Sequence, residues 1–305
     1  MSIIFSDGFP KEIKRTLSAD LETSASISSP TVASILGKMD IDIGTLMVML
    51  LPTASSYAVV PISGFHVGAI ALGLAKPDGP GTLYLGSNME FTGQALLYSV
   101  HGEQSATNNA WISGETGLQA IAINAAPCGY CRQFLYETST ANKGFEVLLK
   151  ENADPKDFRY KAAPLTHFLP DAFGPANLKI SDRLMQASTH GFRIDDPDPV
   201  IEAALKAANA SYAPYTQNAS GVALQLDDGQ IFAGRYAENA AFNPSMSPLE
   251  SALAWMNMNR PAGARYYIED AVLVENASSV ISQKEATKAV LSSVAPSVRL
   301  RHFPV

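Results

Sequence analysis

One short segment, residues 100 to 134 (VHGEQSATNNAWISGETGLQAIAINAAPCGYCRQF), constrains this chain more than any other. It holds both cysteines of the sequence, Cys128 and Cys131, in a Pro-Cys-x-x-Cys motif, and a His-x-Glu motif at His101 and Glu103. Two cysteines this close suit a metal or a redox pair in a reducing compartment better than a structural disulfide framework. The cysteine pair alone favours neither alternative, but the His-x-Glu motif favours zinc.

The predicted local structure limits where a metal could bind. Val100 to Ile112 has the pattern of a helix, Leu118 to Asn124 that of a buried strand, and Cys128 to Glu137 that of a second helix. Residues i and i+2 lie on nearly opposite flanks of a helix, so His101 and Glu103 cannot both reach a metal lying beside it. The metal is therefore expected at the end of the helix, where the N-termini of both helices converge.

The number of ligands indicates a catalytic site. One histidine and two cysteines leave the fourth tetrahedral position for water, and zinc lowers the pKa of that water so that hydroxide is available near neutral pH. We expect His101, Cys128 and Cys131 to hold one zinc ion per chain. Glu103 is predicted to be a general acid and base, not a ligand, that moves protons between the water, a ring nitrogen and departing ammonia.

Composition sets limits on the fold and the partners. With 305 residues, 47% of them hydrophobic and 17% charged, the chain is expected to form two globular domains. A net charge of -7 and the lack of a basic cluster argue against a nucleic acid partner. The apolar run around Leu46 to Leu51 is too short for a membrane span, and the first residues lack a signal-peptide pattern, so a cytoplasmic location is expected.

Strands and helices alternate along the chain, which predicts an α/β layer structure. A small helical segment, broken at Pro30 and Pro52, is expected first, followed by a β-hairpin around the turn AKPDGPG. Residues 152 to 199 have the composition of a long connection with little regular structure. A second hairpin is expected around the Asp-Asp-Gly turn at 227 to 229.

The second hairpin begins a weak internal repeat of the first. In this alignment Asn88 matches Asn239, and the helix SPLESALAW places Glu250 opposite Glu103. The strand that follows, from Ala271, supplies no cysteine. We therefore expect a second domain of the same fold that cannot bind the metal, in which Glu250 is an ordinary helix acid.

The segments HGEQSATNNAW and APCGYCRQF closely resemble the cytidine deaminase family, in particular its dimeric branch, whose subunit carries one catalytic and one degenerate domain. The resemblance continues through PISGFHVGAIA, SNMEF, LPDAFGP, SGVAL and YAENAAFNP. It implies a duplicated three-layer α/β/α fold. The expected parts are an N-terminal helical segment (1–50), a catalytic zinc domain (51–152), a linker contributing to the neighbouring active site (153–199) and a degenerate domain (200–305).

The resemblance also implies substrate contacts. Asn88 and Glu90 match residues that hold the ribose hydroxyls, and the backbone around Gly102 and Ala126 is expected to contact the carbonyl and amino groups of the base. Phe65 matches an aromatic residue that packs on the pyrimidine ring. Without the resemblance, a core aromatic would be the preferred interpretation of Phe65.

A homodimer is implied as well, because Phe173 in LPDAFGP matches a residue that reaches the active site of the neighbouring subunit. Two residues depart from the family pattern near the metal. Gly102 stands where the family often has Ala, and Tyr130 stands where related sequences have His between the cysteines. Neither departure removes a zinc ligand.

The implied activity is hydrolytic deamination of cytidine and 2′-deoxycytidine to uridine and 2′-deoxyuridine with release of ammonia, in pyrimidine salvage. Zinc-bound hydroxide would attack C4 of the base, with Glu103 as the proton shuttle. The alternatives are the same chemistry on another cytosine-containing small molecule, or a redox or structural-zinc binding protein. Asn88 and Glu90 favour a nucleoside, because a carboxylate in the sugar pocket would repel a phosphate.

Overall fold

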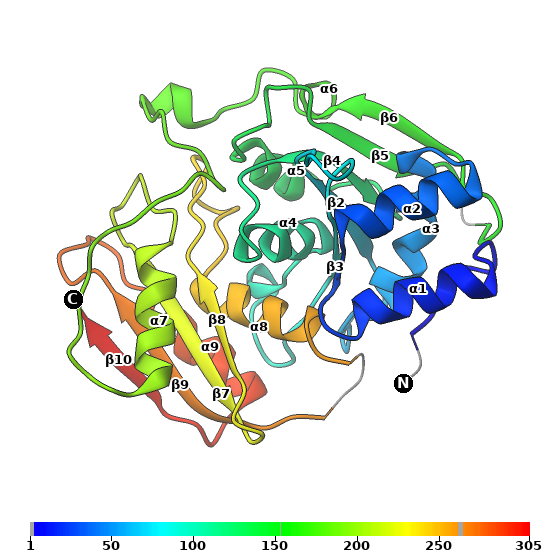
Figure 1. The fold of residues 1–305 in the computed structure, drawn as a ribbon. Helices are drawn as coiled ribbons and strands as arrows, with labels where there is room; N and C mark the ends of the chain where they lie inside the picture. Colours follow the sequence, from blue (N-terminus) through cyan, green and yellow to red (C-terminus); the bar gives the residue numbers. More distant parts are fainter. Residues whose placement is uncertain (1–2, 153, 262–264) are drawn as a thin grey trace.

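Two β-sheets organise the computed structural model, which describes residues 3–152, 154–261 and 265–305 (Figure 1). The first sheet has the order β1-β3-β2-β4-β5-β6 and the second has the order β10-β9-β7-β8. The strands are β1 (Ser26–Ile27), β2 (Gly68–Gly73), β3 (Leu83–Ser87), β4 (Leu118–Ile123), β5 (Glu146–Lys150), β6 (Tyr160–Pro164), β7 (Ser220–Leu226), β8 (Ile231–Arg235), β9 (Ile268–Glu275) and β10 (Leu300–Pro304).

Helices cover both faces of each sheet. In the part of the chain that the structure describes, no helix is long and apolar enough to cross a membrane. The helices are α1 (Lys11–Leu21), α2 (Ser29–Met39), α3 (Ile43–Ser55), α4 (Gly102–Ile112), α5 (Gly129–Tyr136), α6 (Leu165–Phe168), α7 (Pro199–Asn209), α8 (Pro248–Met258) and α9 (Lys284–Val294), with short 3-10 helices η1 (Leu96–Tyr98) and η2 (Pro175–Leu178).

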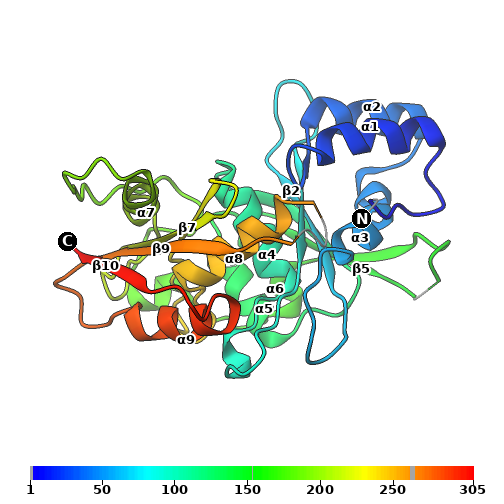
Figure 2. The same ribbon diagram turned by 90° about the horizontal axis from the view of Figure 1, so that it is seen from below.

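The alternation of side chains along the strands divides the molecule into layers. In β2, Ile70 faces the core that contains residues of α1, α2 and α3, whereas Ala71 faces the core that contains α4. In β7, Leu224 faces the same central core, whereas Ala223 packs against α7. The helices α4 and α8 therefore lie between the two sheets, as both ribbon views show (Figure 2). The predicted layered α/β fold, duplicated and preceded by a helical segment, is confirmed.

The central helix α4 is buried almost throughout although it is rich in polar residues. The buried Nδ2 groups of Asn108 and Asn109 both donate hydrogen bonds. The Asn109 Nδ2 group donates to the carbonyl oxygens of Ala25 and Leu85, both at 2.9 Å, and so ties β1 and β3 to the helix. The Asn108 Nδ2 group donates to the carbonyl oxygen of Ser251 in α8 at 3.0 Å. The polar face of α4 thus joins the two halves of the chain.

The same unit occurs twice, as α3-β2-β3-α4-β4-α5-β5 and as α7-β7-β8-α8-β9-α9-β10. In each unit the first two strands are antiparallel and the last two are parallel. A Cβ atom on Gly86 would lie 2.1 Å from the backbone nitrogen of Ala106, and one on Gly234 would lie 2.0 Å from that of Ala252. A helix therefore crosses each hairpin at a point where only glycine fits.

The equivalence of Gly86 and Gly234 corrects the strand alignment predicted from the internal repeat. Counting two residues on from each glycine, Asn88 corresponds to Tyr236 and not to Asn239. The sequence alignment was based on identical asparagine and phenylalanine residues in the two halves. The structural equivalence is based instead on the glycine at which the helix comes closest to the strand. By the same count, Glu90 corresponds to Glu238.

The starts of α4 and α8 also correct the predicted repeat, by one residue. Glu250 Oε2 accepts a hydrogen bond from the backbone N–H of Ser247 at 2.8 Å, and Gln104 Oε1 accepts one from the N–H of His101 at 3.1 Å. Each bond joins the third residue of a helix to the residue that precedes the helix. Glu250 is therefore the counterpart of Gln104 and not of Glu103.

Proline does not break the N-terminal helices as predicted. Pro30 lies in the first turn of α2, where its missing N–H is not needed. Pro52 lies inside α3, which continues to Ser55. Because α3 is buried against β2, its packing compensates for the lost backbone hydrogen bond. The predicted domain boundary at residue 50 thus falls within a helix.

The connection from 153 to 199 has more regular structure than its composition indicates. Strand β6 lies in it and pairs antiparallel with β5 at the edge of the first sheet, followed by α6 and η2. Pairing covers an edge that β5 would otherwise expose, and so offsets the weak strand propensity of the segment. The rest of the connection runs along the second half toward α7 (Figure 1).

Candidate active site

His101, Cys128 and Cys131 form a triangle of potential metal ligands. His101 Nδ1 lies 3.2 Å from Cys131 Sγ and 3.5 Å from Cys128 Sγ, and the two sulfurs are 3.6 Å apart. Around a tetrahedral zinc ion, with bonds of about 2.1 Å to nitrogen and 2.3 Å to sulfur, ligand atoms are about 3.6–3.8 Å apart. The triangle therefore fits zinc with one position open. Among the residues that the structure describes, no other group of this kind is present.

The ligands lie at two helix N-termini, as predicted. His101 directly precedes α4 and Cys128 directly precedes α5, each with an extended backbone, while Cys131 lies in the first turn of α5. The partial positive charge at a helix N-terminus stabilises a thiolate and other negative charge. The N-terminus of α5 thus favours the thiolate form of Cys128 and Cys131, and the N-terminus of α4 directs a second partial positive charge to the same place.

The three groups share protons through their hydrogen bonds. Hydrogen bonding by Cys131 and His101 lowers the pKa of the Cys128 thiol to about 3, and the bond to Cys128 raises the pKa of His101. The pKa of Cys131 is raised, first by its bond to Cys128 and then by burial, because this thiol keeps the shared proton. The lowered pKa of Cys128 matters most for metal binding, since a thiolate can accept a metal ion without first losing a proton.

Glu103 lies beside the triangle but outside the set of ligands. It is the second residue of α4 and is only 4% exposed. Burial raises the pKa of its carboxyl group, and His101 partly offsets this effect. A buried carboxyl group with a raised pKa is suited to both accept and donate a proton.

A single cavity of about 480 Å³ collects most of the residues predicted to contact a substrate. All predicted site residues line it except Cys131, which bonds to two of the lining residues, and Phe173. Its walls come from the loop before β2, the ends of β3 and β4, and the starts of α4 and α5. The predicted residues in the lining are Phe65, Asn88, Glu90, His101, Gly102, Glu103, Ala126 and Cys128.

Phe173 lies outside this cavity and is 45% exposed. Its carbonyl oxygen accepts a hydrogen bond from Gln133 Nε2 at 2.8 Å, which fixes the connection to α5. The contact of Phe173 with a neighbouring subunit, expected from the sequence, stays a prediction.

Several lining residues were not predicted from the sequence. Ser63 is the most informative, because its hydroxyl group bonds to Glu90. The internal repeat carried a signal for it, since Pro-Ile-Ser at 61–63 matches Pro-Tyr-Thr at 214–216 and keeps a hydroxyl group at the third place. The other lining residues that were missed are Ile62, Val67, Met89, Leu96, Ser99, Val100 and Ala125.

In the second half, protein side chains occupy the place that corresponds to the ligand triangle. Gln283, which precedes α9 as Cys128 precedes α5, donates its backbone N–H to Glu275 Oε2 at 2.8 Å. Glu275 Oε1 lies 2.7 Å from His302 Nε2. Asn218 is fully buried and donates to the carbonyl oxygen of Ile281 at 2.8 Å. A carboxylate therefore takes the position at the helix start that the thiolates take in the first half.

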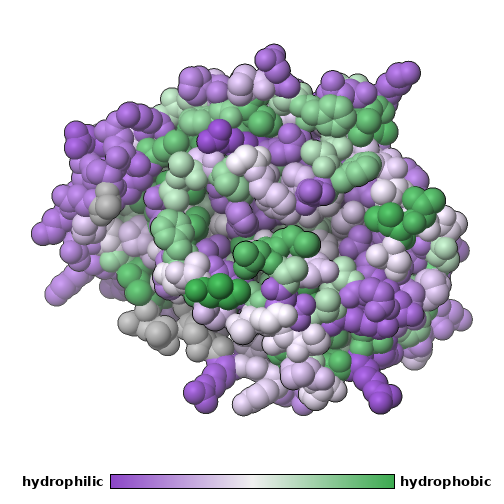
Figure 3. Space-filling model, turned by 180° about the vertical axis from the view of Figure 1, so that it is seen from behind, coloured by the Kyte–Doolittle hydropathy of each residue, from purple (hydrophilic) through white to green (hydrophobic). Residues whose placement is uncertain are grey.

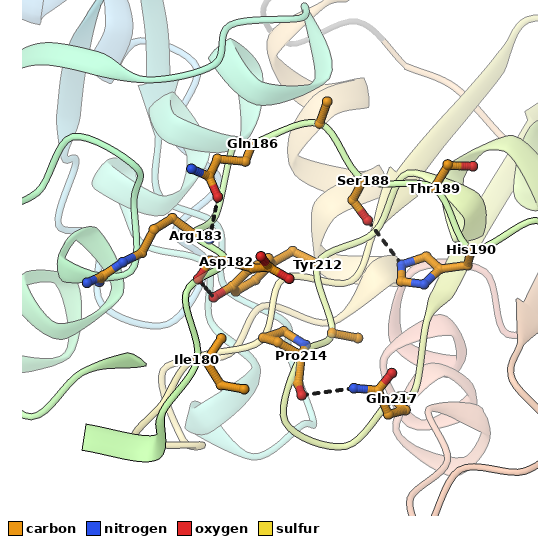
Figure 4. A pocket seen from close by; sticks show the side chains of 12 residues that line it. Ile180, Asp182, Arg183, Gln186, Ser188, Thr189, His190, Tyr212, Pro214 and Gln217 are labelled. Atoms are coloured by element: carbon orange, nitrogen blue, oxygen red, sulfur yellow. Dashed lines mark hydrogen bonds between the residues drawn. The ribbon is translucent and has the colours of Figure 1, made fainter. Parts of the chain in front are cut away.

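Another cavity, of about 370 Å³, lies between the connection and the loop after α7 (Figure 4). Several of its polar groups bond to one another or to the backbone. Ser188 Oγ and His190 Nε2 both contact the carbonyl oxygen of Ser211, at 3.0 Å each, and Gln217 Nε2 donates to the carbonyl oxygen of Pro214 at 2.9 Å. This cavity does not hold the ligand triangle.

A three-ligand centre with an open position and a buried carboxyl group beside it belongs to a zinc-dependent hydrolase. Comparison with known proteins narrows this class. Residues 42–145 and residues 165–288 each match a family model described as "Cytidine and deoxycytidylate deaminase zinc-binding region". The chain belongs to the cytidine deaminase family.

Two of the similar proteins match nearly the whole chain, and a solved structure matches less than half of it. A cytidine deaminase of Photobacterium profundum is 44% identical over 93% of this chain and 90% of its own. One of Aeromonas hydrophila is 46% identical over 90% of this chain and 88% of its own. A crystal structure of a cytidine deaminase from Mycobacterium tuberculosis aligns with 44% of this chain and 99% of its own, with 26% identity and a TM-score of 0.34.

Proposed function

We propose that this protein hydrolyses cytidine and 2′-deoxycytidine to uridine and 2′-deoxyuridine with release of ammonia, in pyrimidine salvage. The observation that carries the proposal is the arrangement of three zinc ligands and buried Glu103 in one cavity with Asn88 and Glu90. The names of the similar proteins support the choice of nucleoside.

His101, Cys128 and Cys131 are the proposed zinc ligands, one ion per chain. When bound, zinc supplies a water molecule that is activated as a nucleophile near neutral pH. Glu103 takes one proton of that water and delivers it to N3 of the base. It then takes the second proton, from the hydroxyl group added at C4, and gives it to the amino group that leaves as ammonia. Its burial supports this role, because burial raises the pKa of the carboxyl group and so favours its holding a proton.

Phe65 is proposed to pack on the pyrimidine ring, and Asn88 and Glu90 to hold the ribose hydroxyl groups. All three line the cavity that contains the ligands, which supports these roles. Gly102 and Ala126 line the cavity near the metal, where their backbone groups can bond to the polar edge of the base. The pKa of Glu90 is lowered by its hydrogen bonds to Ser63, so it is ionised at neutral pH and disfavours a phosphate nearby.

We propose the four-part division of the chain predicted above, and a homodimer located in the cytoplasm. Large apolar side chains at the mouth of the cavity support a covering partner, because Leu96 is 71% and Phe65 61% exposed. Phe173, 45% exposed, is the residue proposed to enter the neighbouring site. Hydrophobic side chains also gather near the middle of one face of the molecule (Figure 3).

The proposal is tested by ultraviolet absorbance with cytidine, 2′-deoxycytidine, cytosine and CMP, together with the metal content of the purified protein. We expect turnover of both nucleosides, little turnover of cytosine or CMP, and one zinc per chain. Faster turnover of CMP than of cytidine would contradict the placement of Glu90. A metal-free protein with a reversible Cys128–Cys131 disulfide would support the redox alternative instead.

A further inference from the structure

The two side chains assigned to the ribose are already bonded to the loop that carries Phe65. Glu90 Oε2 accepts hydrogen bonds from the backbone N–H groups of Ile62 (2.8 Å) and Ser63 (3.0 Å). Glu90 Oε1 accepts one from the hydroxyl group of Ser63, whose Oγ in turn accepts from the N–H of Phe65 at 3.0 Å. Asn88 Nδ2 donates to the carbonyl oxygen of Phe65 at 2.8 Å. Both residues therefore position the loop from 59 to 67.

The second half repeats the carboxylate part of this arrangement. Glu238 Oε2 accepts from the backbone N–H groups of Tyr215 (2.7 Å) and Thr216 (3.2 Å), and Glu238 Oε1 accepts from the hydroxyl group of Thr216. Thr216 Oγ1 accepts from the N–H of Asn218 at 3.2 Å, as Ser63 Oγ accepts from the N–H of Phe65.

The turns in the two loops also agree. Gly64 and Gln217 have φ angles of 65° and 59°, and each donates its N–H to a carbonyl oxygen four residues earlier, at 3.0 and 3.1 Å. The turn of the second loop, with Pro214 and Gln217, is visible in Figure 4. Because the second half lacks the ligand triangle, a bond network kept there serves the loop and not a substrate. The same network in the first half therefore has a positioning role of its own.

We infer that Ser63 is a positioning residue, which couples the Glu90 carboxylate to the backbone of Phe65 and so fixes the aromatic ring at the cavity. An ionised carboxylate has about four acceptor positions, and the loop occupies three of those of Glu90, which leaves one for a sugar hydroxyl group. The inference rests on the proposed function, since the ring is positioned for the base of a nucleoside.

The test compares Ser63→Ala with Ser63→Thr, the residue type that the second half uses at this place. Ser63 is exposed, so its replacement leaves the core intact. We expect Ser63→Ala to raise KM for cytidine about tenfold with little change in kcat, because it weakens binding and not the chemical step. Ser63→Thr keeps the hydroxyl group and is expected to keep KM within about twofold.

A double-mutant cycle with Phe65→Ala separates positioning from direct contact. If Ser63 acts through Phe65, the double variant has about the same KM as Phe65→Ala alone. Full additivity of the two effects, or an unchanged KM in Ser63→Ala, would overturn the inference. Thr216→Ala is the matched control, since it breaks the corresponding network in the second half and should leave KM unchanged.

Amide hydrogen exchange gives a measurement that does not depend on turnover. Ser63→Ala should speed exchange of the backbone N–H groups at positions 62, 63 and 65 about tenfold or more, and Thr216→Ala should do so at positions 216 and 218. Unchanged exchange in Ser63→Ala would overturn the inference even in an active enzyme. A wild-type protein that does not deaminate nucleosides refutes the proposed function instead, and exchange still decides whether Ser63 holds the loop.

Discussion

The two halves of the molecule present the same pair of helix N-termini to the same place in the fold, but use them differently. In the first half, His101 precedes α4 and Cys128 precedes α5, and together with Cys131 they form the metal-binding triangle. In the second half, Ser247 precedes α8, and the start of α9 is occupied by the Glu275 carboxylate.

This difference teaches that the helix ends need negative charge or hydrogen-bond acceptors whether or not there is catalysis. Thiolates meet the need in one half, and a capping hydroxyl group and a buried carboxylate meet it in the other. The second half could therefore lose the metal ligands without leaving its helix ends unsatisfied.

The largest expected difference between the halves concerns Glu103, whose place in the second half is taken by Leu249. Glu103→Ala should lower kcat by about 10³-fold, because the proposed proton shuttle is lost, while the zinc content should stay at one per chain. Steady-state assays with cytidine and metal analysis of the same sample check both statements. A rate close to that of the wild type would show that another group carries the proton.

The glycines at the helix crossings give a matched pair of variants. Gly86→Ala and Gly234→Ala each place a Cβ atom about 2 Å from helix backbone, so each should lower the free energy of unfolding by about 3 kcal/mol. Thermal or chemical denaturation measures this loss. Only Gly86→Ala should also reduce the activity of the folded fraction, because α4 carries Glu103. Equal loss of activity in both variants would contradict the assignment of the active site to the first half alone.

Glu250→Gln places in the second half the residue type that the first half has at Gln104. Burial raises the pKa of Glu250 to about 7, above its ordinary value of 4.5. Since the pKa is higher in the folded state, proton binding by Glu250 stabilises the fold. This contribution to the free energy of unfolding is fully present below about pH 4.5 and is lost as the pH rises through 7. The amide stays neutral and can still accept the bond from Ser247.

The free energy of unfolding of the wild type should therefore fall by about 3 kcal/mol relative to that of Glu250→Gln as the pH rises from 5 to 8. Denaturation curves at the two pH values, with an activity assay as the control, check this. A difference from the wild type that does not change with pH would contradict the raised pKa.

Gly102→Ala should have the smallest effect. The two halves differ at the first position of this helix, which is Gly102 in α4 and Pro248 in α8. A Cβ atom on Gly102 would lie 2.9 Å from Val67 Cγ1, a side chain that can move. We expect a change in KM of less than about threefold and a stability change within about 0.5 kcal/mol. A tenfold change in KM would show that the fit at Val67 controls substrate binding.

The prediction of the metal site from the sequence was more accurate than the prediction of which residues correspond in the internal repeat. The spacing of His101, Cys128 and Cys131 is local to two helix starts, and helix geometry places such residues reliably. The alignment of Asn88 and Glu250 failed because loops of different length separate the elements. Nothing in the pattern of residues around Glu90 predicts its bonds to the loop at 62–63, since they join segments far apart in the sequence.

The buried polar surface of α4 has a consequence for how the protein can be divided. Asn108 is satisfied by Ser251, and the apolar side of α4 facing the second half is covered by α8. A chain ending after the first sheet would expose this surface to water and leave the Asn108 amide without its partner. Helix α4, which carries the proposed proton shuttle Glu103, is thus an interior element of the molecule, and we expect the two halves to unfold as one cooperative unit.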